Sequence, residues 1–221
     1  MTESVIQNNL NCVDRVLISP HSTSSFQFPQ PLQLGILASG SGTNFEAVAK
    51  AIATGQLNAE IKVLIYNNPE AKVRSRGEKY NVPTIFIDHR NYTRENLDRE
   101  IVAVMKNYGV DWIIMAGWMR IVTQELLEGF PNRVINIHPS LLPSFKGIRA
   151  IEQALAAKVK ITGCTVHLVS LEVDSGEILM QAAVPVLSDD TLDSLHARIQ
   201  IQEHRILPQA IALAASITLQ T

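Results

Sequence analysis

An asparagine and a histidine stand two residues apart where an apolar run meets a proline-containing loop, in VINIHPSLLP (134–143). Side chains at i and i+2 of a strand share a face, so Asn136 and His138 would point to one place. Pro139 and Pro143 would stiffen the loop after them. An amide and an imidazole so placed can stabilise an oxyanion and move a proton. Taken alone, they could equally be two satisfied polar groups at a strand end.

A carboxylate in LEVDSGE (171–177) could complete this group. If Asp174 lies beside His138, it would orient the imidazole and favour its protonated form. Asp174-Ser175-Gly176 by itself is a common hairpin turn. The catalytic hypothesis therefore requires the two segments to meet in the fold. The other strand histidine, His167, lies in an apolar run and is predicted to be a satisfied structural residue.

A second stretch with chemical potential is the glycine-rich LGILASGSGTNFEAV (34–48), whose pattern predicts a strand, a tight turn and a helix. Gly40 and Gly42 would allow close backbone approach, and Thr43 or Asn44 could cap the helix. Free N–H groups at the helix start could hold a phosphate. The spacing matches neither a dinucleotide fingerprint nor a P-loop. A tight turn without a ligand is an equally good interpretation of this stretch alone.

Short apolar runs alternate with amphipathic ones along the rest of the chain. We expect helices over 44–54, 70–80 and 93–108 and a long last helix over 191–216, kinked or interrupted at Pro208. The expected strands are 34–38, 60–66, 84–87, 111–117 and 134–137, followed by an antiparallel pair at 162–169 and 178–186.

This βαβ alternation predicts an α/β fold. We expect an open, mainly parallel Rossmann-like sheet of about seven strands with helices on both faces and an antiparallel C-terminal hairpin. Ligands of such sheets bind beyond the carboxyl ends of the strands. Residues 1–32, rich in Ser, Gln, Asn and Pro, are predicted to be a flexible polar extension. Residues 33–221 are predicted to form a single domain.

Composition narrows the class of partner. The net charge of −2 comes without a run of basic residues, which argues against nucleic acid and favours small-molecule substrates. Cys12 and Cys164 have no metal-binding spacing and suggest no disulfide framework, so a reducing, cytoplasmic location without a metal fits best. No apolar run reaches the ~18 residues of a membrane helix. We expect a monomer or weak homodimer.

Several motifs follow one another from about Leu34 to Ile211: SGSGTN (39–44), AGWMRIV (116–122), NIHPSLLP (136–143), GCTVHLV with VDSG (163–176) and QIQEHRILP (200–208). In these motifs the chain resembles the glycinamide ribonucleotide formyltransferases of purine synthesis. The Asn-x-His and Asp set is common to the wider folate-dependent superfamily. The glycine-rich loop and the QIQEH segment point to this member.

The resemblance implies transfer of a formyl group from 10-formyltetrahydrofolate, acting as co-substrate, to the amine of 5'-phosphoribosylglycinamide. It implies three catalytic residues, Asn136, His138 and Asp174. The implied acceptor contacts are Gly42, Thr43, Asn44 and Glu203. The implied folate contacts are Arg94, Met119, Arg120, Ile121, Val122, Asn136, Ser170, Leu171, Glu172, Val173 and Asp174. The chain departs from the family at Ile151, near which members often carry a histidine.

Three other functions would use some of the same residues. A formyltetrahydrofolate hydrolase uses the same three residues but usually has an additional N-terminal domain. Its sequence resembles His-His-Ser at the catalytic histidine, where this chain has His138-Pro139-Ser140. A methionyl-tRNA formyltransferase has a further C-terminal domain and needs a basic surface. A non-catalytic nucleotide-binding module would explain the glycine-rich turn but gives no purpose to the Asn, His and Asp set.

Overall fold

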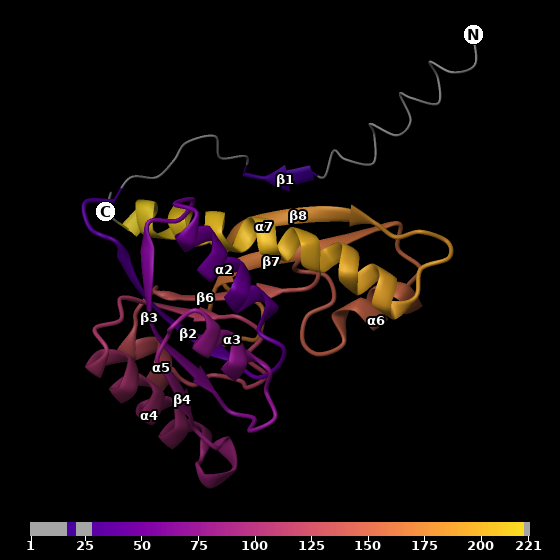
Figure 1. Cartoon of the computed structure of the whole chain (residues 1–221). Coiled ribbons are helices and arrows are strands. Elements are labelled where there is room, and N and C mark those ends of the chain that lie inside the picture. The colour runs from indigo at the N-terminus through magenta and orange to yellow at the C-terminus, as the bar shows by residue number, and fades with distance from the viewer. Residues whose placement is uncertain (1–16, 21–27, 219–221) are drawn as a thin grey trace.

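The computed structural model describes residues 17–20 and 28–218, and its centre is a twisted sheet (Figure 1). Eight strands lie in the order β1-β8-β7-β6-β5-β2-β3-β4. The strands β4, β3, β2, β5 and β6 run parallel, whereas β7, β8 and β1 continue the sheet antiparallel. The predicted α/β class, with a mainly parallel sheet and an antiparallel C-terminal hairpin, is confirmed.

The seven expected strands all form, with ends within about two residues of prediction. The sheet contains β1 (Leu17–Ser19), β2 (Leu32–Ala38), β3 (Ala59–Tyr66), β4 (Thr84–Phe86), β5 (Trp112–Met115), β6 (Val134–His138), β7 (Ile161–Leu168) and β8 (Ile178–Pro185). Their continuous apolar character arises because helices or loops cover both faces of the sheet.

Helices cover both faces, as predicted (Figure 1). They are α2 (Thr43–Ala53), α3 (Val73–Lys79), α4 (Arg94–Asn107), α5 (Gln124–Gly129), α6 (Ala150–Ala156) and α7 (Leu192–Thr218), with a 3-10 turn, η1 (His89–Asn91). Apolar residues of α2, α3, α6 and α7 pack in one core cluster, and those of α4 and α5 pack in a second cluster. None of the helices in the described ranges is long and apolar enough to cross a membrane.

The structure adds elements that the sequence pattern did not predict. The short helices α5 and α6 have six and seven residues, too few to give a clear period. The last helix continues through Pro208, so the predicted interruption of the helix at this residue does not occur. Ile151, where a family histidine is often found, is buried in α6 and packs in the core.

The eighth strand, β1, lies within the stretch predicted to be a flexible extension. Its three residues pair with Gln181 to Ala183 of β8 at the edge of the sheet. Phe28 of the same stretch is buried in the core, so at least these parts of residues 1–32 are structured. Residues 1–16 and 21–27 lie outside the described part, and the domain boundary at residue 33 stays a prediction.

The order of the strands creates a topological switch beside β2. The chain passes from β2 to β3 on one side and later places β5 on the other. Hydrogen bonds join the segments that follow β2 and β5. Ser39 N–H donates to Gly117 O at 3.0 Å, and Met119 N–H donates to Ser39 Oγ at 2.9 Å. Ligands of open α/β sheets bind at such a point.

Candidate active site

The end of β6 brings Asn136, His138 and Asp174 together. Asn136 and His138 lie on the same face of β6, and His138 Nδ1 is 3.3 Å from Asp174 Oδ2. The His138 and Asp174 side chains are only 7% and 9% exposed. An imidazole and a carboxylate so close and so buried interact more strongly than in water. The structure thus contains the juxtaposition that the catalytic hypothesis requires, while the roles themselves stay predictions.

Asp174 is held by the loop between β7 and β8. Its own backbone has φ +50°, a left-handed conformation that Asp tolerates better than most residues. Gly176 is required nearby, because a Cβ there would lie 1.7 Å from Leu168 O. Burial opposes ionisation of Asp174, but the Gly147 N–H at 2.8 Å and the charge of His138 contribute to lowering its pKa below the usual 3.8. Asp174 is therefore an anion at neutral pH.

The second ring nitrogen of His138 also faces an oxygen. Nε2 lies 2.8 Å from the carbonyl oxygen of Phe145, a residue whose backbone has φ +56°. A carbonyl and a carboxylate both accept hydrogen bonds, so the arrangement suits a ring with a proton on each nitrogen. His138 is thus placed as a cationic donor paired with Asp174.

The loop that carries Phe145 is fixed by buried polar groups. Thr165 Oγ1 donates to Ser140 O at 2.7 Å and accepts from Leu142 N–H at 3.0 Å. Gln181 Nε2 donates to Leu142 O and to Thr165 Oγ1, both at 3.0 Å. These bonds join the loop after β6 to strands β7 and β8, and they explain how the proline-containing loop keeps its position beside His138.

The glycine-rich turn leads from β2 into α2. Gly42 is the residue before the helix and has φ +76°, and a Cβ on it would lie 2.3 Å from Val73 Cγ2. Only glycine fits both the conformation and the space. The prediction that Thr43 or Asn44 caps the helix is wrong, since no side chain bonds to the first N–H groups. Those N–H groups remain available to an anion.

Two residues of α7 reach the start of α2. Asn44 Nδ2 donates to Glu203 Oε2 at 3.1 Å, and Gln200 Nε2 donates to Thr43 Oγ1 at 3.1 Å. Glu203 is 6% exposed, and its burial raises the pKa of the carboxyl above 4.5 even though the bond from Asn44 and the charge of His196 act in the opposite direction. A carboxyl in such a place is suited to accept an N–H group of a ligand.

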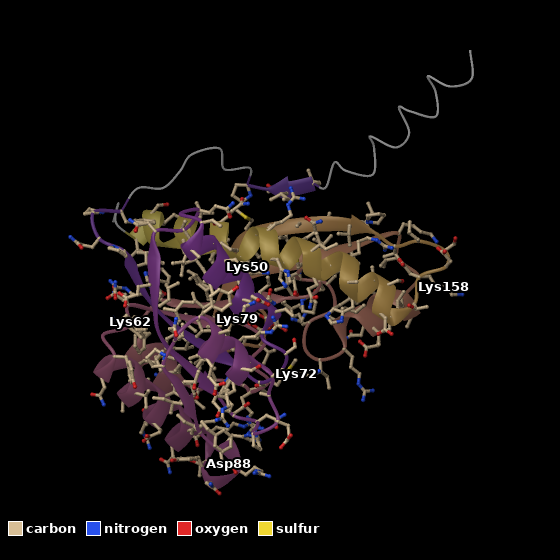
Figure 2. The ribbon with its side chains drawn as sticks, in the orientation of Figure 1. Lys50, Lys62, Lys72, Lys79, Asp88 and Lys158 are labelled. Carbon is tan, nitrogen blue, oxygen red and sulfur yellow. The ribbon has the colours of Figure 1, made fainter. Side chains whose placement is uncertain are left out.

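Cations gather beside the same turn. Arg76 Nε donates to Ser41 O at 2.8 Å, and its guanidinium is paired with Glu46. Lys50 and Lys79, labelled in Figure 2 on α2 and α3, also lie within 4 Å of Glu46, at 3.9 and 2.8 Å. Three cations around one carboxylate leave a positive potential close to the free N–H groups of α2.

The predicted folate segment 119–122 follows β5. Met119 and Ile121 are 75% and 50% exposed, which is unusual for apolar side chains and leaves them free to contact a ligand. Val122 is instead buried in the core, so its side chain does not face solvent. Arg120 Nε is buried without a hydrogen-bond partner among the described residues. Met119 and Arg120 line a 350 Å³ hollow that also includes Ser39 of the glycine-rich turn.

Arg94 and the loop 170–174 complete the predicted folate set. Arg94 is exposed at the start of α4, one turn before Asp98, whose Oδ2 accepts Thr123 N–H at 2.5 Å. This bond places that end of α4 against the segment after Val122. Leu171, Glu172 and Val173 are all exposed, and Ser170 Oγ donates to Glu172 O at 3.0 Å. In the described part of the chain, no hydrogen bond or ion pair joins Arg94 to the loop 170–174.

Two residues at the site were not predicted as functional. His167 is buried as expected, but its Nε2 lies 3.1 Å from Asn136 Nδ2 and 3.6 Å from Asp174 Oδ1. The contact of His167 with Asn136 depends on the register between β6 and β7, which the sequence does not reveal. Gln200 donates a hydrogen bond to Thr43. It could have been predicted from its position three residues before Glu203, because residues at this spacing lie on the same side of a helix.

Comparisons with known proteins identify the family of the chain. The family model described as Formyl transferase matches residues 32–211. A phosphoribosylglycinamide formyltransferase of Bacillus subtilis is 36% identical over 180 residues, covering 81% of this chain and 92% of the relative. The human trifunctional purine biosynthetic protein adenosine-3 is 38% identical over 207 residues. The 207 aligned residues cover 93% of this chain but only 20% of the human protein, so the chain spans about a fifth of that relative.

Solved structures of phosphoribosylglycinamide formyltransferases have a similar fold. The glycinamide ribonucleotide transformylase 1 of Symbiobacterium toebii superposes with a TM-score of 0.84 at 42% identity, covering 90% of this chain and 93% of the other. The phosphoribosylglycinamide formyltransferase of Bacillus halodurans gives 0.80 at 40% identity, with coverages of 86% and 97%. The chain therefore belongs to the formyl transferase family and, within it, to the phosphoribosylglycinamide formyltransferases.

Proposed function

We propose that this protein transfers the formyl group of 10-formyltetrahydrofolate to the amine of 5'-phosphoribosylglycinamide, a step of purine biosynthesis. The observation that carries the proposal is the contact of His138 with Asp174, beside Asn136 on the same strand face. The free helix start after Gly42 supports a phosphorylated acceptor. Family membership supports the same assignment.

The first step is attack of the neutral amine nitrogen of the acceptor on the formyl carbon. A new C–N bond forms, and the carbonyl oxygen becomes an oxyanion on a tetrahedral carbon. A protonated His138 and the amide N–H of Asn136 stabilise that oxyanion, with Asp174 keeping the imidazole charged. Preorganised donors in a buried site stabilise such charge strongly, because they need no reorientation during the reaction.

The second step breaks the bond between the formyl carbon and N10 of the folate. The attacking nitrogen loses a proton and N10 gains one, so the two products are neutral at these atoms. Asp174 assists this transfer directly or through a water molecule. These steps need no metal ion, since charge is carried by His138 and Asp174 throughout.

Substrate binding is divided between the two ends of the site. Gly42, Thr43 and Asn44 would hold the phosphate at the start of α2, and Glu203 would hold the glycinamide end. The folate would lie against Met119 to Val122 and the loop 170–174, with Arg94 near its acidic tail. The exposed apolar side chains of Met119 and Ile121 support this assignment.

Acceptor dependence is the experiment that tests the proposal. Deformylation of 10-formyltetrahydrofolate is followed spectroscopically with and without phosphoribosylglycinamide. Turnover that requires the acceptor is expected. Equal rates in both tubes would identify a hydrolase instead, and no turnover in either would reject the enzymatic assignment. A monomer or weak homodimer in the cytoplasm remains our expectation, and sedimentation of the purified full chain at several concentrations tests the oligomeric state.

A further inference from the structure

His167 occupies the centre of the candidate site without having been assigned a role. It pairs directly with Asn136 across the β6 and β7 strands, so the two side chains share a face of the sheet. The ring is 2% exposed and lies between the Asn136 amide and the Asp174 carboxylate. A buried ring in contact with two predicted catalytic groups can influence both of them.

One ring nitrogen of His167 has a defined protonation. Nδ1 lies 2.8 Å from Leu168 O, and a carbonyl oxygen can only accept a hydrogen bond. Nδ1 therefore carries a proton. In a neutral ring, Nε2 then has a lone pair and must accept a hydrogen bond from a neighbour.

Charge balance favours that neutral ring. Among the described residues, Asp174 is the single carboxylate within 4 Å of either imidazole. Its Oδ2 already faces His138 and the Gly147 N–H. A second imidazolium would leave a buried positive charge without its own counter-ion, which is costly. The separation of 3.6 Å between His167 Nε2 and Asp174 Oδ1 is also longer than a hydrogen bond.

We propose that His167 is a positioning residue that fixes the side-chain amide of Asn136. Its Nε2 lone pair accepts one N–H of Asn136 at 3.1 Å, which forces the NH₂ group, rather than the amide oxygen, toward His167. The other N–H of the same group is then left to donate to the oxyanion. This inference rests on the proposed formyl transfer, because it explains how that reaction receives a correctly oriented amide.

The test compares two replacements of similar size in the full chain. Gln in His167→Gln retains an acceptor oxygen, whereas Leu in His167→Leu has none. We expect kcat to fall by about tenfold or more in His167→Leu, less than the ~10²–10³-fold loss of a whole oxyanion donor. His167→Gln should recover much of that loss, and the KM values should change little. Equal kcat losses in the two variants would overturn the proposal.

A double-mutant cycle separates positioning from general structural support. If His167 acts through Asn136, the kcat loss of His167→Leu should disappear in an Asn136→Ala background. Val166→Ala is the matched control, since Val166 neighbours His167 on β7 but packs in the core. Its effect should be the same in both backgrounds. A His167→Leu loss that is also the same in both would contradict the assignment.

Nitrogen-15 NMR of the wild-type imidazole rings gives a readout that needs no activity. We expect His167 to show a protonated Nδ1 and an unprotonated Nε2. A protonated Nε2 would overturn the positioning role even in an active enzyme. An inactive wild type with the expected tautomer would reject formyl transfer instead, so the two failures are distinguishable.

Discussion

The glycine-rich turn and the centre around His138 both lie at the carboxyl ends of parallel strands but are built differently. The turn, residues 39–44, is one continuous stretch, and what it offers a ligand is backbone N–H groups at the start of α2. The centre comprises Asn136 and His138 of β6, His167 of β7 and Asp174 of the following loop. The turn is local in sequence, whereas the centre exists only after three segments have folded together.

This difference separates binding from chemistry. Backbone donors cannot be removed by replacing a side chain, so variants at the turn should act by repelling or loosening the ligand. The donors of the centre are side chains, and each can be deleted. We therefore expect variants of the centre to lower kcat and variants around the turn to raise KM for phosphoribosylglycinamide.

The largest effect is expected from removing an oxyanion donor. Asn136→Ala and His138→Ala should each reduce kcat by about 10²–10³-fold, because the charge that develops in the transition state loses a preorganised donor. Steady-state kinetics measures the change, and circular dichroism checks that the variants fold. Near-normal turnover in both would remove these residues from the mechanism.

A substitution in α7 should affect binding and stability in opposite directions. Glu203→Gln should raise KM for the acceptor by about tenfold, as expected for loss of a hydrogen bond to a charged group. Glu203 has a raised pKa in the folded state, so its protonated form contributes stability below pH 4.5 that is lost as pH rises through the folded pKa. Gln does not ionise, so the variant should be more stable than wild type at neutral pH, by about 0.5–2 kcal/mol.

Unfolding by urea at several pH values checks this stability prediction. The advantage of Glu203→Gln should grow as pH rises above 4.5. A difference in unfolding free energy that is constant with pH would show that ionisation of Glu203 is not its cause.

A negative charge at the start of α2 should weaken the acceptor. Thr43→Asp should raise KM for phosphoribosylglycinamide about fivefold, since a carboxylate there competes with the phosphate for the positive helix end. Thr54→Asp, at the exposed far end of the same helix, adds the same charge and serves as the control. Equal KM values for Thr43→Asp and wild type would reject a phosphate site at this turn.

The smallest effect is expected behind the turn. Arg76→Gln removes the charged donor to Ser41 O and should raise the same KM about two- to threefold with kcat unchanged, because partly exposed ion pairs contribute less than about 1 kcal/mol. Arg74→Gln is the control, since Arg74 lies on the same helix but pairs with Glu78. A larger effect at Arg74 than at Arg76 would exclude support of the turn by Arg76.

Periodicity predicted most of the fold because long elements carry many apolar positions. Seven strands and four of the helices were predicted, whereas α5 and α6 were too short to give a period. The strand β1 was missed because three residues of a polar stretch become a strand only by pairing with β8. The capping prediction at Thr43 failed since the turn is held by its neighbours: Val73 N–H donates to Gly40 O at 3.1 Å.

The candidate site also combines features that the local sequence predicts with features that only the tertiary structure reveals. The sequence alone determined which residue types were present and that Asn136 and His138 share a face, because alternation along a strand is a local property. Only the tertiary structure decided that Asp174 reaches His138 and that His167 lies opposite Asn136. Strand register and the path of a loop depend on packing across the whole sheet, so residues with no local connection acquire a common chemistry only in the folded chain.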